Sequence, residues 1–267
     1  MDFKRVLTAL IGLPAVILAI IFGNQYAIGI GILIVSIISM HEYFGVIKKV
    51  SRPIEWVAYL SNMFIVGAIY LDTNTLIQTV LLSIPFIMLT LFLQVIVTAM
   101  KTTFKDVAYT LTGILYIPFF LMFLEFIRCM DNGKVLVGYT LVIAWSTDIF
   151  AYLIGKKFGK HKFSKISPKK SIEGAIAGIV GSILITIIYT CIVKRFCQME
   201  YSYLFIAIIS FGLSILSQIG DFVASSIKRF VDTKDYGNLL PGHGGMLDRV
   251  DSLLFILPFT YIVFLIL

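Results

Sequence analysis

Charged residues are scarce in this chain, and their scarcity excludes an ordinary soluble domain. Only 14% of the 267 residues are charged, whereas a soluble domain carries about a quarter. Hydrophobic residues make up 59% of the chain and gather in repeated apolar runs. Runs of roughly 18 or more apolar residues are typical of transmembrane helices. The sequence therefore predicts an all-α fold, a polytopic transmembrane helix bundle.

Cysteine is scarce as well. The three cysteines, Cys129, Cys191 and Cys197, have no metal-site spacing and form no even-numbered disulfide framework. We therefore interpret them as packing residues, and we look for chemistry among the carboxylates, hydroxyls and basic side chains.

The apolar runs predict nine membrane spans. They cover residues 6–22, 26–47, 54–71, 76–100, 107–123, 135–154, 172–193, 203–230 and 252–267. Of the 22 Lys and Arg residues, 18 lie at the N-terminus and in the loops after the even-numbered spans. The positive-inside rule then places the N-terminus in the cytoplasm. The net charge of +7 reflects these loops, and no nucleic-acid partner is expected.

The polar residues divide the chain into two regions. Residues 1–134 hold the first five spans and little else. Residues 135–267 form a predicted catalytic region with two cytoplasmic loops, 155–171 and 221–251, which carry most of the polar residues.

The first of these loops follows a costly carboxylate. Asp148 lies in the sixth apolar run, so it should face the bundle interior or a wet cavity. Seven lysines follow within a short stretch, and an anchor for anionic lipids or an orientation signal would also explain them. However, hydroxyl and ammonium groups at a helix N-terminus also suit phosphate oxygens. The groups in question are those of Ser167, Lys169, Lys170 and Ser171, and Glu173 accompanies them at the start of the next run.

The eighth run carries a polar stripe. Ser210, Ser214, Ser217, Asp221, Ser225 and Lys228 recur at intervals of three and four residues, which places them on one helical face. Such a stripe lines a cavity or a helix contact. Close helix packing through small residues explains the serines, but it does not explain the two charged residues at the cytoplasmic end.

A glycine-rich segment, residues 241–245, follows the eighth run. Its glycines free the backbone to form an anion-binding nest. Asp248 and Asp251 come next, one turn apart and flanking Arg249. Together with Asp221 they supply the hard oxygen ligands that Mg²⁺ prefers. His243 is interpreted either as a general base or as a group that contacts phosphate, and both roles stay open.

Residues 225–251 match an extended pattern. They read S-x-I-K-R, four residues, K-D-x-G, two residues, then L-P-x-H-G-G-M-x-D-R-V-D. This pattern resembles the signature of the phosphatidate cytidylyltransferases, also called CDP-diacylglycerol synthases. Residues 145–156 and 167–174 resemble a second block of that family, whereas the N-terminal half offers only a compatible hydropathy profile.

The resemblance implies an enzyme of phospholipid biosynthesis that joins CTP to phosphatidic acid, releases pyrophosphate and forms CDP-diacylglycerol. It also implies a divalent metal and a bacterial inner-membrane location with the site on the cytoplasmic side. A second, monovalent cation and a homodimer stay open. We expect Asp221 and Asp248 to hold Mg²⁺. The catalytic candidates are Asp221, Asp248, Lys228, Arg229 and His243. The candidates for substrate binding are Asp148, Ser167, Lys169, Lys170, Ser171, Glu173, Ser225, Lys234, Asp235, Gly244, Gly245, Arg249 and Asp251.

Two other functions compete with this interpretation. Asp148 and Asp221 in apolar runs could mark a proton or cation path through a transporter, although no corresponding helix breaks appear in two halves of the chain. A related enzyme, such as a CTP-dependent polyprenol kinase or an archaeal-lipid cytidylyltransferase, would use the same residue types on another lipid acceptor.

Overall fold

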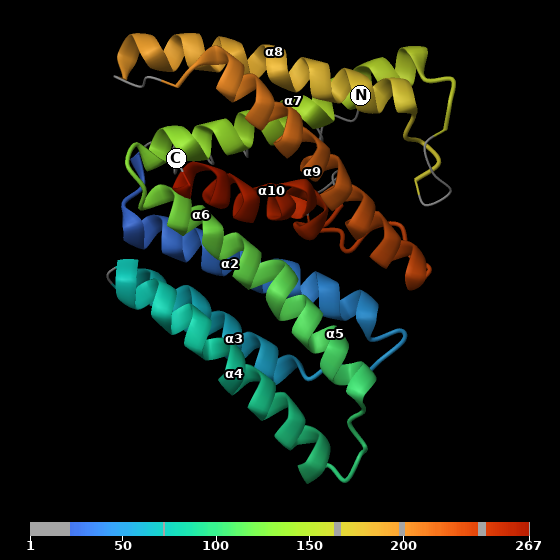
Figure 1. Cartoon of the computed structure of the whole chain (residues 1–267). Helices are drawn as coiled ribbons and strands as arrows, with labels where there is room; N and C mark the ends of the chain where they lie inside the picture. Colours follow the sequence, from blue (N-terminus) through green and yellow to red (C-terminus); the bar gives the residue numbers. More distant parts are fainter. Residues whose placement is uncertain (1–21, 72, 163–166, 198–200, 240–243, 267) are drawn as a thin grey trace. The chain divides into compact units, whose positions relative to one another are not determined.

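The computed structural model describes residues 22–71, 73–162, 167–197, 201–239 and 244–266 (Figure 1). Within these ranges the chain is helical and contains no β-strand, and an isolated antiparallel bridge joins Lys162 to Ser171. The all-α prediction is confirmed. The first predicted span, residues 6–22, lies almost wholly outside the described residues.

The chain forms two compact units, and each is described by itself. One unit comprises Met1–Cys129 with Phe230–Val250, and the other comprises Met130–Arg229 with Asp251–Leu267. We call them the N-terminal unit and the C-terminal unit. These units follow from packing, so the predicted division by function after residue 134 stays a prediction.

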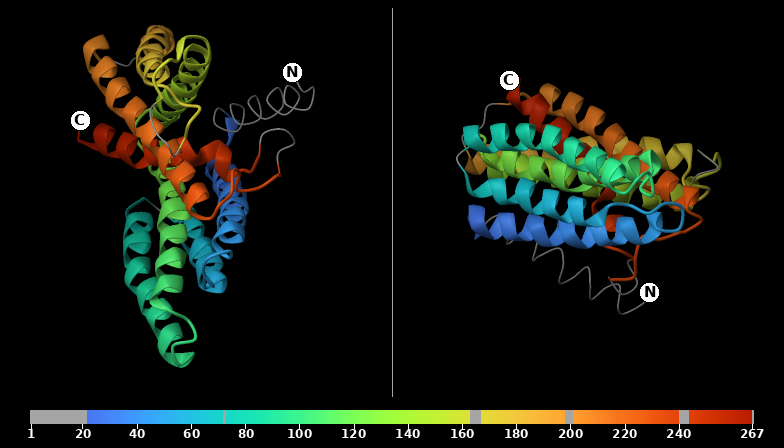
Figure 2. Two further views of the ribbon diagram at one scale, coloured as in Figure 1. Left: turned by 90° about the vertical axis from the view of Figure 1, so that its right-hand side faces the viewer. Right: turned by 90° about the horizontal axis from the view of Figure 1, so that it is seen from below.

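The N-terminal unit is a set of helices packed side by side (Figure 2). Helix α3 contacts α2, α4 and α5, and α2 also contacts α6. The helices are α2 (Gln25–Ile47), α3 (Glu55–Gly67), the 3₁₀ turn η1 (Ala68–Tyr70), α4 (Thr73–Val97), α5 (Phe104–Ile114), the π-helical segment η2 (Leu115–Phe119) and α6 (Phe120–Arg128). The π-helical segment contains Pro118, whose missing N–H prevents a regular α-helical ladder at that point.

The start of α5 shows how a loop is fixed in this unit. Thr103 and Asp106 form a capping box, in which each side chain bonds the backbone of the other residue. The Asp106 carboxylate also accepts hydrogen bonds from the Ser51 hydroxyl and from the Arg52 N–H. One buried acid therefore ties the loop after α2 to the start of α5.

The C-terminal unit contains α7 (Gly133–Phe158), α8 (Ile172–Phe196), α9 (Tyr203–Phe230, whose last residue belongs to the N-terminal unit) and most of α10 (Leu247–Leu265). Glycines let α7 and α8 approach closely. A Cβ atom on Gly178 would lie 2.9 Å from the Thr147 carbonyl oxygen, and one on Gly181 would lie 2.2 Å from the Phe150 ring.

Six of the nine predicted runs are confirmed as helices that are long and apolar enough to cross a membrane. Among the described residues they are Gln25–Ile47, Ile77–Val97, Phe104–Arg128, Gly133–Phe158, Ile172–Phe196 and Tyr203–Phe230. The third and ninth runs correspond to α3 and α10. Helix α3 is only 13 residues long, and α10 carries Asp248, Arg249 and Asp251 in its first turns. The count of nine spans therefore stays a prediction.

Candidate active site

The membrane half of the polar stripe on α9 is a helix contact. Ser210, Ser214 and Ser217 are completely buried. The Ser210 hydroxyl lies 3.1 Å from the Ser182 hydroxyl of α8, and the Thr147 hydroxyl of α7 donates to that of Ser214 at 2.9 Å. The stripe is confirmed, and its serines serve close packing between helices.

The C-terminal end of the stripe is charged and meets the lysine-rich loop. The Lys170 ammonium group forms an ion pair with the Asp221 carboxylate. The same group lies 4.2 Å from the centroid of the Phe222 ring, a cation–π contact. The Ser225 hydroxyl donates to Asp221 at 3.4 Å. The C-terminal unit thus brings together Lys170, Asp221 and Ser225, which the sequence assigns to one site.

Asp251 lies in the same electrostatic environment. Its side chain is buried, at 7% exposure, and accepts a hydrogen bond from the Ser252 N–H at 2.8 Å. Burial raises the pKa of the Asp251 carboxyl, and the negative charges of Asp221 and Asp148 raise it further, whereas Lys228 opposes them. These groups lie close enough together for their charges to interact.

The carboxylates of the C-terminal unit have the chemistry that suits a divalent cation. Asp148, Asp221 and Asp251 offer the hard carboxylate oxygens that suit Mg²⁺, and a cation would relieve the repulsion that raises the Asp251 pKa. In the described part of the chain, however, no three His, Cys, Asp or Glu side chains are arranged as a ready metal site. Asp221 belongs to the C-terminal unit and Asp248 to the N-terminal unit, and their joint metal site stays a prediction.

The sequence predicts that Asp148 faces the bundle interior or a wet cavity, and the structure does not place it in the interior. Its side chain is exposed rather than buried inside the bundle. The Ser252 hydroxyl of α10 donates to its carboxylate at 3.2 Å. Asp148 is therefore accessible at the end of α7 that leads into the lysine-rich loop.

Ser171 and Glu173 fix the junction between the lysine-rich loop and α8. Ser171 caps α8, because its buried hydroxyl accepts the Gly174 N–H at 3.1 Å. Glu173 accepts the N–H groups of Lys160 and His161, and one of its oxygens lies 2.6 Å from His161 Nδ1. Both residues are substrate-binding candidates from the sequence, and in the structure Ser171 caps α8 and Glu173 binds the loop backbone.

The carboxylate of Asp248 is fixed by backbone donors in the N-terminal unit. Its Oδ2 atom accepts the Tyr236 N–H at 2.9 Å and the Gly245 N–H at 3.1 Å. Gly244 has a φ of +84°, a conformation that side chains rarely adopt. A Cβ atom there would also lie 3.2 Å from Asp248 Oδ2. The glycines therefore serve this turn and its contact with Asp248.

The remaining candidates differ in exposure. Lys228 is buried and Ser167 is half-buried, whereas Lys169, Arg229, Lys234, Asp235 and Arg249 are exposed. His243 lies outside the described residues, so its two roles stay open.

Glu42 is a residue of this region that the sequence analysis missed. It lies in α2 at 8% exposure, and its two oxygens accept the N–H groups of Met246 and Leu247. The signal that could have found it is an acid within the second apolar run. The same signal led to Asp148.

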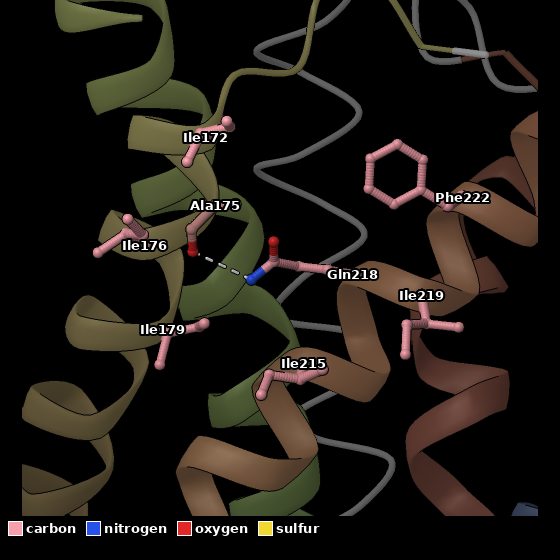
Figure 3. A pocket seen from close by; sticks show the side chains of 8 residues that line it. All are labelled: Ile172, Ala175, Ile176, Ile179, Ile215, Gln218, Ile219 and Phe222. Carbon is pink, nitrogen blue, oxygen red and sulfur yellow. Dashed lines mark hydrogen bonds between the residues drawn. The ribbon is translucent and has the colours of Figure 1, made fainter. Parts of the chain in front are cut away.

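An apolar groove between α8 and α9 leads to the charged end of α9 (Figure 3). It encloses about 260 Å³ and is lined by Ile172, Ala175, Ile176, Ile179, Ile215, Gln218, Ile219 and Phe222. Gln218 donates to the Ala175 carbonyl at 3.1 Å. Since the Phe222 ring contacts the Lys170 ammonium group, the groove ends where the charges begin.

The chain is similar to known proteins along most of its length. Residues 3–267 match the model of the Cytidylyltransferase family. A Bacillus subtilis protein named phosphatidate cytidylyltransferase is 40% identical over 161 residues, which are 60% of this chain and 58% of that protein. Proteins of the same name are 35% identical over 179 residues in Staphylococcus haemolyticus (67% of this chain, 65% of that one) and 40% identical over 167 residues in Thermotoga maritima (61% of each).

The matched part thus spans less than two thirds of each of these relatives. The family model, in contrast, extends over nearly the whole sequence, including both polar loops and α2. The chain belongs to the Cytidylyltransferase family.

Proposed function

We propose that this chain is a phosphatidate cytidylyltransferase, which transfers cytidylate from CTP to phosphatidic acid in phospholipid biosynthesis. The observation that carries the proposal is the contact between Lys170 and Asp221. Lys170 belongs to one sequence block that resembles the family, and Asp221 lies one helical turn before the other block, which begins at Ser225. The chain as a whole belongs to the Cytidylyltransferase family.

The reaction needs no nucleophile from the protein. An oxygen of the phosphatidic acid phosphate attacks the α-phosphorus of CTP, a new P–O bond forms, and the bond to the β-phosphate breaks as pyrophosphate leaves. Catalysis then consists of positioning the two phosphates in line and of stabilising their charge. A site rich in carboxylates and bases matches this requirement.

Basic side chains of the C-terminal unit supply the charge for the phosphates. Lys170 and Lys228 lie near Asp221 and Asp251, and Arg229 follows on α9. CTP phosphates would compete with Asp221 for the Lys170 ammonium group. We assign Asp221 and Asp248 as the residues that would hold Mg²⁺, which when bound would neutralise charge on CTP and on the leaving pyrophosphate. A second, monovalent cation stays open.

The apolar groove between α8 and α9 provides a place for an acyl chain of the lipid. Its lining is aliphatic apart from Gln218 and the Phe222 ring, and both helices are long and apolar enough to cross a membrane. A phosphatidic acid molecule whose acyl chain lay in this groove would present its phosphate near Lys170. Lateral entry from the bilayer would then deliver the lipid.

We further propose nine spans with a cytoplasmic N-terminus, in a bacterial inner membrane, with the site on the cytoplasmic side. The support is the distribution of basic residues, because 18 of the 22 lie on one side of that topology. Assembly as a homodimer is compatible with this arrangement.

A comparison of lipid acceptors tests the proposed function. The purified full-length chain is incubated in detergent with Mg²⁺, labelled CTP and either phosphatidic acid or a polyprenol. We expect labelled CDP-diacylglycerol and pyrophosphate with phosphatidic acid only. Transfer of a phosphoryl group to the polyprenol would identify a lipid kinase instead. Absence of any CTP turnover, together with ion flux in proteoliposomes, would support a transporter.

A further inference from the structure

Glu42 makes a long-range contact with the start of α10. Its carboxylate on α2 accepts the Met246 N–H at 2.9 Å with one oxygen and the Leu247 N–H at 2.8 Å with the other. All three residues belong to the N-terminal unit. Glu42 is only 8% exposed, so both hydrogen bonds to its carboxylate are largely shielded from water.

This contact satisfies backbone donors at the start of α10. The first N–H groups of a helix have no partner within the helix, and Leu247 is the first residue of α10. Capping is usually done by an acceptor side chain just before the helix. Here Gly244 and Gly245 precede Met246 and have no side chain. The acceptor comes instead from α2, about 200 residues earlier in the chain.

Two signature glycines make room for Glu42. A Cβ atom on Gly237 would lie 2.6 Å from one carboxylate oxygen, and a Cβ atom on Gly245 would lie 2.5 Å from the other. Of the glycines in the described ranges, only Gly244 has a positive φ. Gly237 and Gly245 are therefore required for space and not for backbone conformation.

The residues that Glu42 touches are the neighbours of those that hold Asp248. Gly245 donates its N–H to Asp248 Oδ2 and is followed by Met246, which donates to Glu42. Tyr236 also donates to Asp248 and is followed by Gly237, which lies against Glu42. A displacement of Glu42 would thus shift both backbone groups that orient the Asp248 carboxylate.

We propose that Glu42 is a positioning residue for the reaction. It holds the backbone at Gly237 and Gly245 and the start of α10 so that Asp248 is correctly oriented. This role rests on the proposed function, because it acts through Asp248. Glu42 does not contact a substrate in this assignment, and its effect is transmitted through the backbone of residues 236–237 and 245–247.

The variant Glu42→Gln tests the contact. Glutamine keeps the size of the side chain but presents one oxygen and one NH₂ group, so one of the two backbone donors loses its acceptor. We expect kcat to fall about tenfold to a hundredfold, and the Mg²⁺ concentration for half-maximal activity to rise. Hydrogen exchange of the peptide that contains Met246 and Leu247 should become faster in the full-length protein.

A matched control is Glu125→Gln. Glu125 is also a buried acid of the N-terminal unit, at 1% exposure in α6, and it accepts a hydrogen bond from the Cys129 thiol rather than from the signature. We expect this variant to keep the Mg²⁺ requirement and the exchange of residues 246–247. Equal changes in both variants, or an unchanged exchange rate in Glu42→Gln, would overturn the proposal.

A double-mutant cycle provides a second measurement. With Glu42 present, Gly245→Ala should lower kcat at least about tenfold, because the new methyl group displaces the carboxylate from its two donors. In the Glu42→Ala background the methyl group has room, and the additional loss should be below about threefold. Independent, multiplicative losses would overturn the proposal. If the wild type itself shows no cytidylyl transfer, the proposed function fails and the positioning role with it. The exchange measurement still reports separately whether the contact exists.

Discussion

Removal of the Lys170 ammonium group should separate catalysis from attachment to anionic lipids. The Lys170 and Asp221 side chains that form the ion pair are 30% and 31% exposed. A pair this accessible to water contributes only about 0.2–1 kcal/mol to folding, and the contact with the Phe222 ring adds a similar amount. The thermal unfolding midpoint of Lys170→Ala should therefore stay within about 4 °C of the wild type.

The expected kinetic effect is much larger than the effect on stability. If Lys170 stabilises charge on the CTP phosphates in the transition state, its loss should cost about 3 kcal/mol, or about a hundredfold in kcat/KM. The Mg²⁺ requirement should not increase, because Asp221 keeps its carboxylate and loses a competing cation. This last point distinguishes a phosphate contact from a metal ligand.

The assay is cytidylyl transfer from labelled CTP to phosphatidic acid by purified protein in detergent. Lys157→Ala is the matched control, since it removes the same charge from the same lysine-rich segment and also a cation–π contact, with Phe158. An anionic-lipid anchor would lose about 1 kcal/mol of membrane attraction for either lysine and would show no loss of turnover in detergent. Equal kinetics for the two variants would refute the assignment of Lys170 to the phosphates.

Three further outcomes are expected. Asp221→Asn and Asp248→Asn should each lose at least about a hundredfold in kcat, with only partial recovery in excess Mg²⁺, and activity should cease in excess chelator; full activity of either variant at low Mg²⁺ would contradict the metal assignment. Asp232→Asn, at an exposed position outside the signature's fixed residues, should remain near wild-type activity. Single cysteines at Lys160 and His243, in a chain without its native cysteines, should resist an impermeant thiol reagent applied to the outer face of intact cells, and labelling of both would reject the topology.

Helix positions and faces could be predicted because they depend on neighbours in the sequence. The three- and four-residue spacing of Ser210, Ser214 and Ser217 places them on one face whatever surrounds the helix, and all three are buried. Six of the nine predicted apolar runs likewise correspond to long apolar helices in the described part of the chain. The predicted run ends at residue 71, whereas α3 ends at Gly67 and a short 3₁₀ turn follows it. No hydropathy profile records that change.

Partners across long sequence distances could not be predicted. Nothing near Glu42 in the sequence indicates that its oxygens accept hydrogen bonds from residues 246 and 247. The sequence also shows which side chains can form hydrogen bonds without showing which partners they find in the folded chain. Ser171 suits a phosphate by its chemistry, yet it caps α8, and Glu173 is bonded to His161. Lys170 was assigned to the site, but its pairing with Asp221 required the folded chain.

Helix α9 combines two environments along one face, and this combination suits the proposed nucleotide chemistry at a bilayer. Within the apolar part, hydroxyl groups of Ser210 and Ser214 bond to hydroxyls on neighbouring helices, so helix contacts form there without burying charge in the membrane. The first acid of the stripe is Asp221, and the adjacent Phe222 lines the apolar groove. A phosphorylated lipid needs an apolar channel and cationic groups within a few ångströms of each other. Lys170 connects the two, because its ammonium group contacts both the Phe222 ring, which lines the groove, and the Asp221 carboxylate at the charged end of α9.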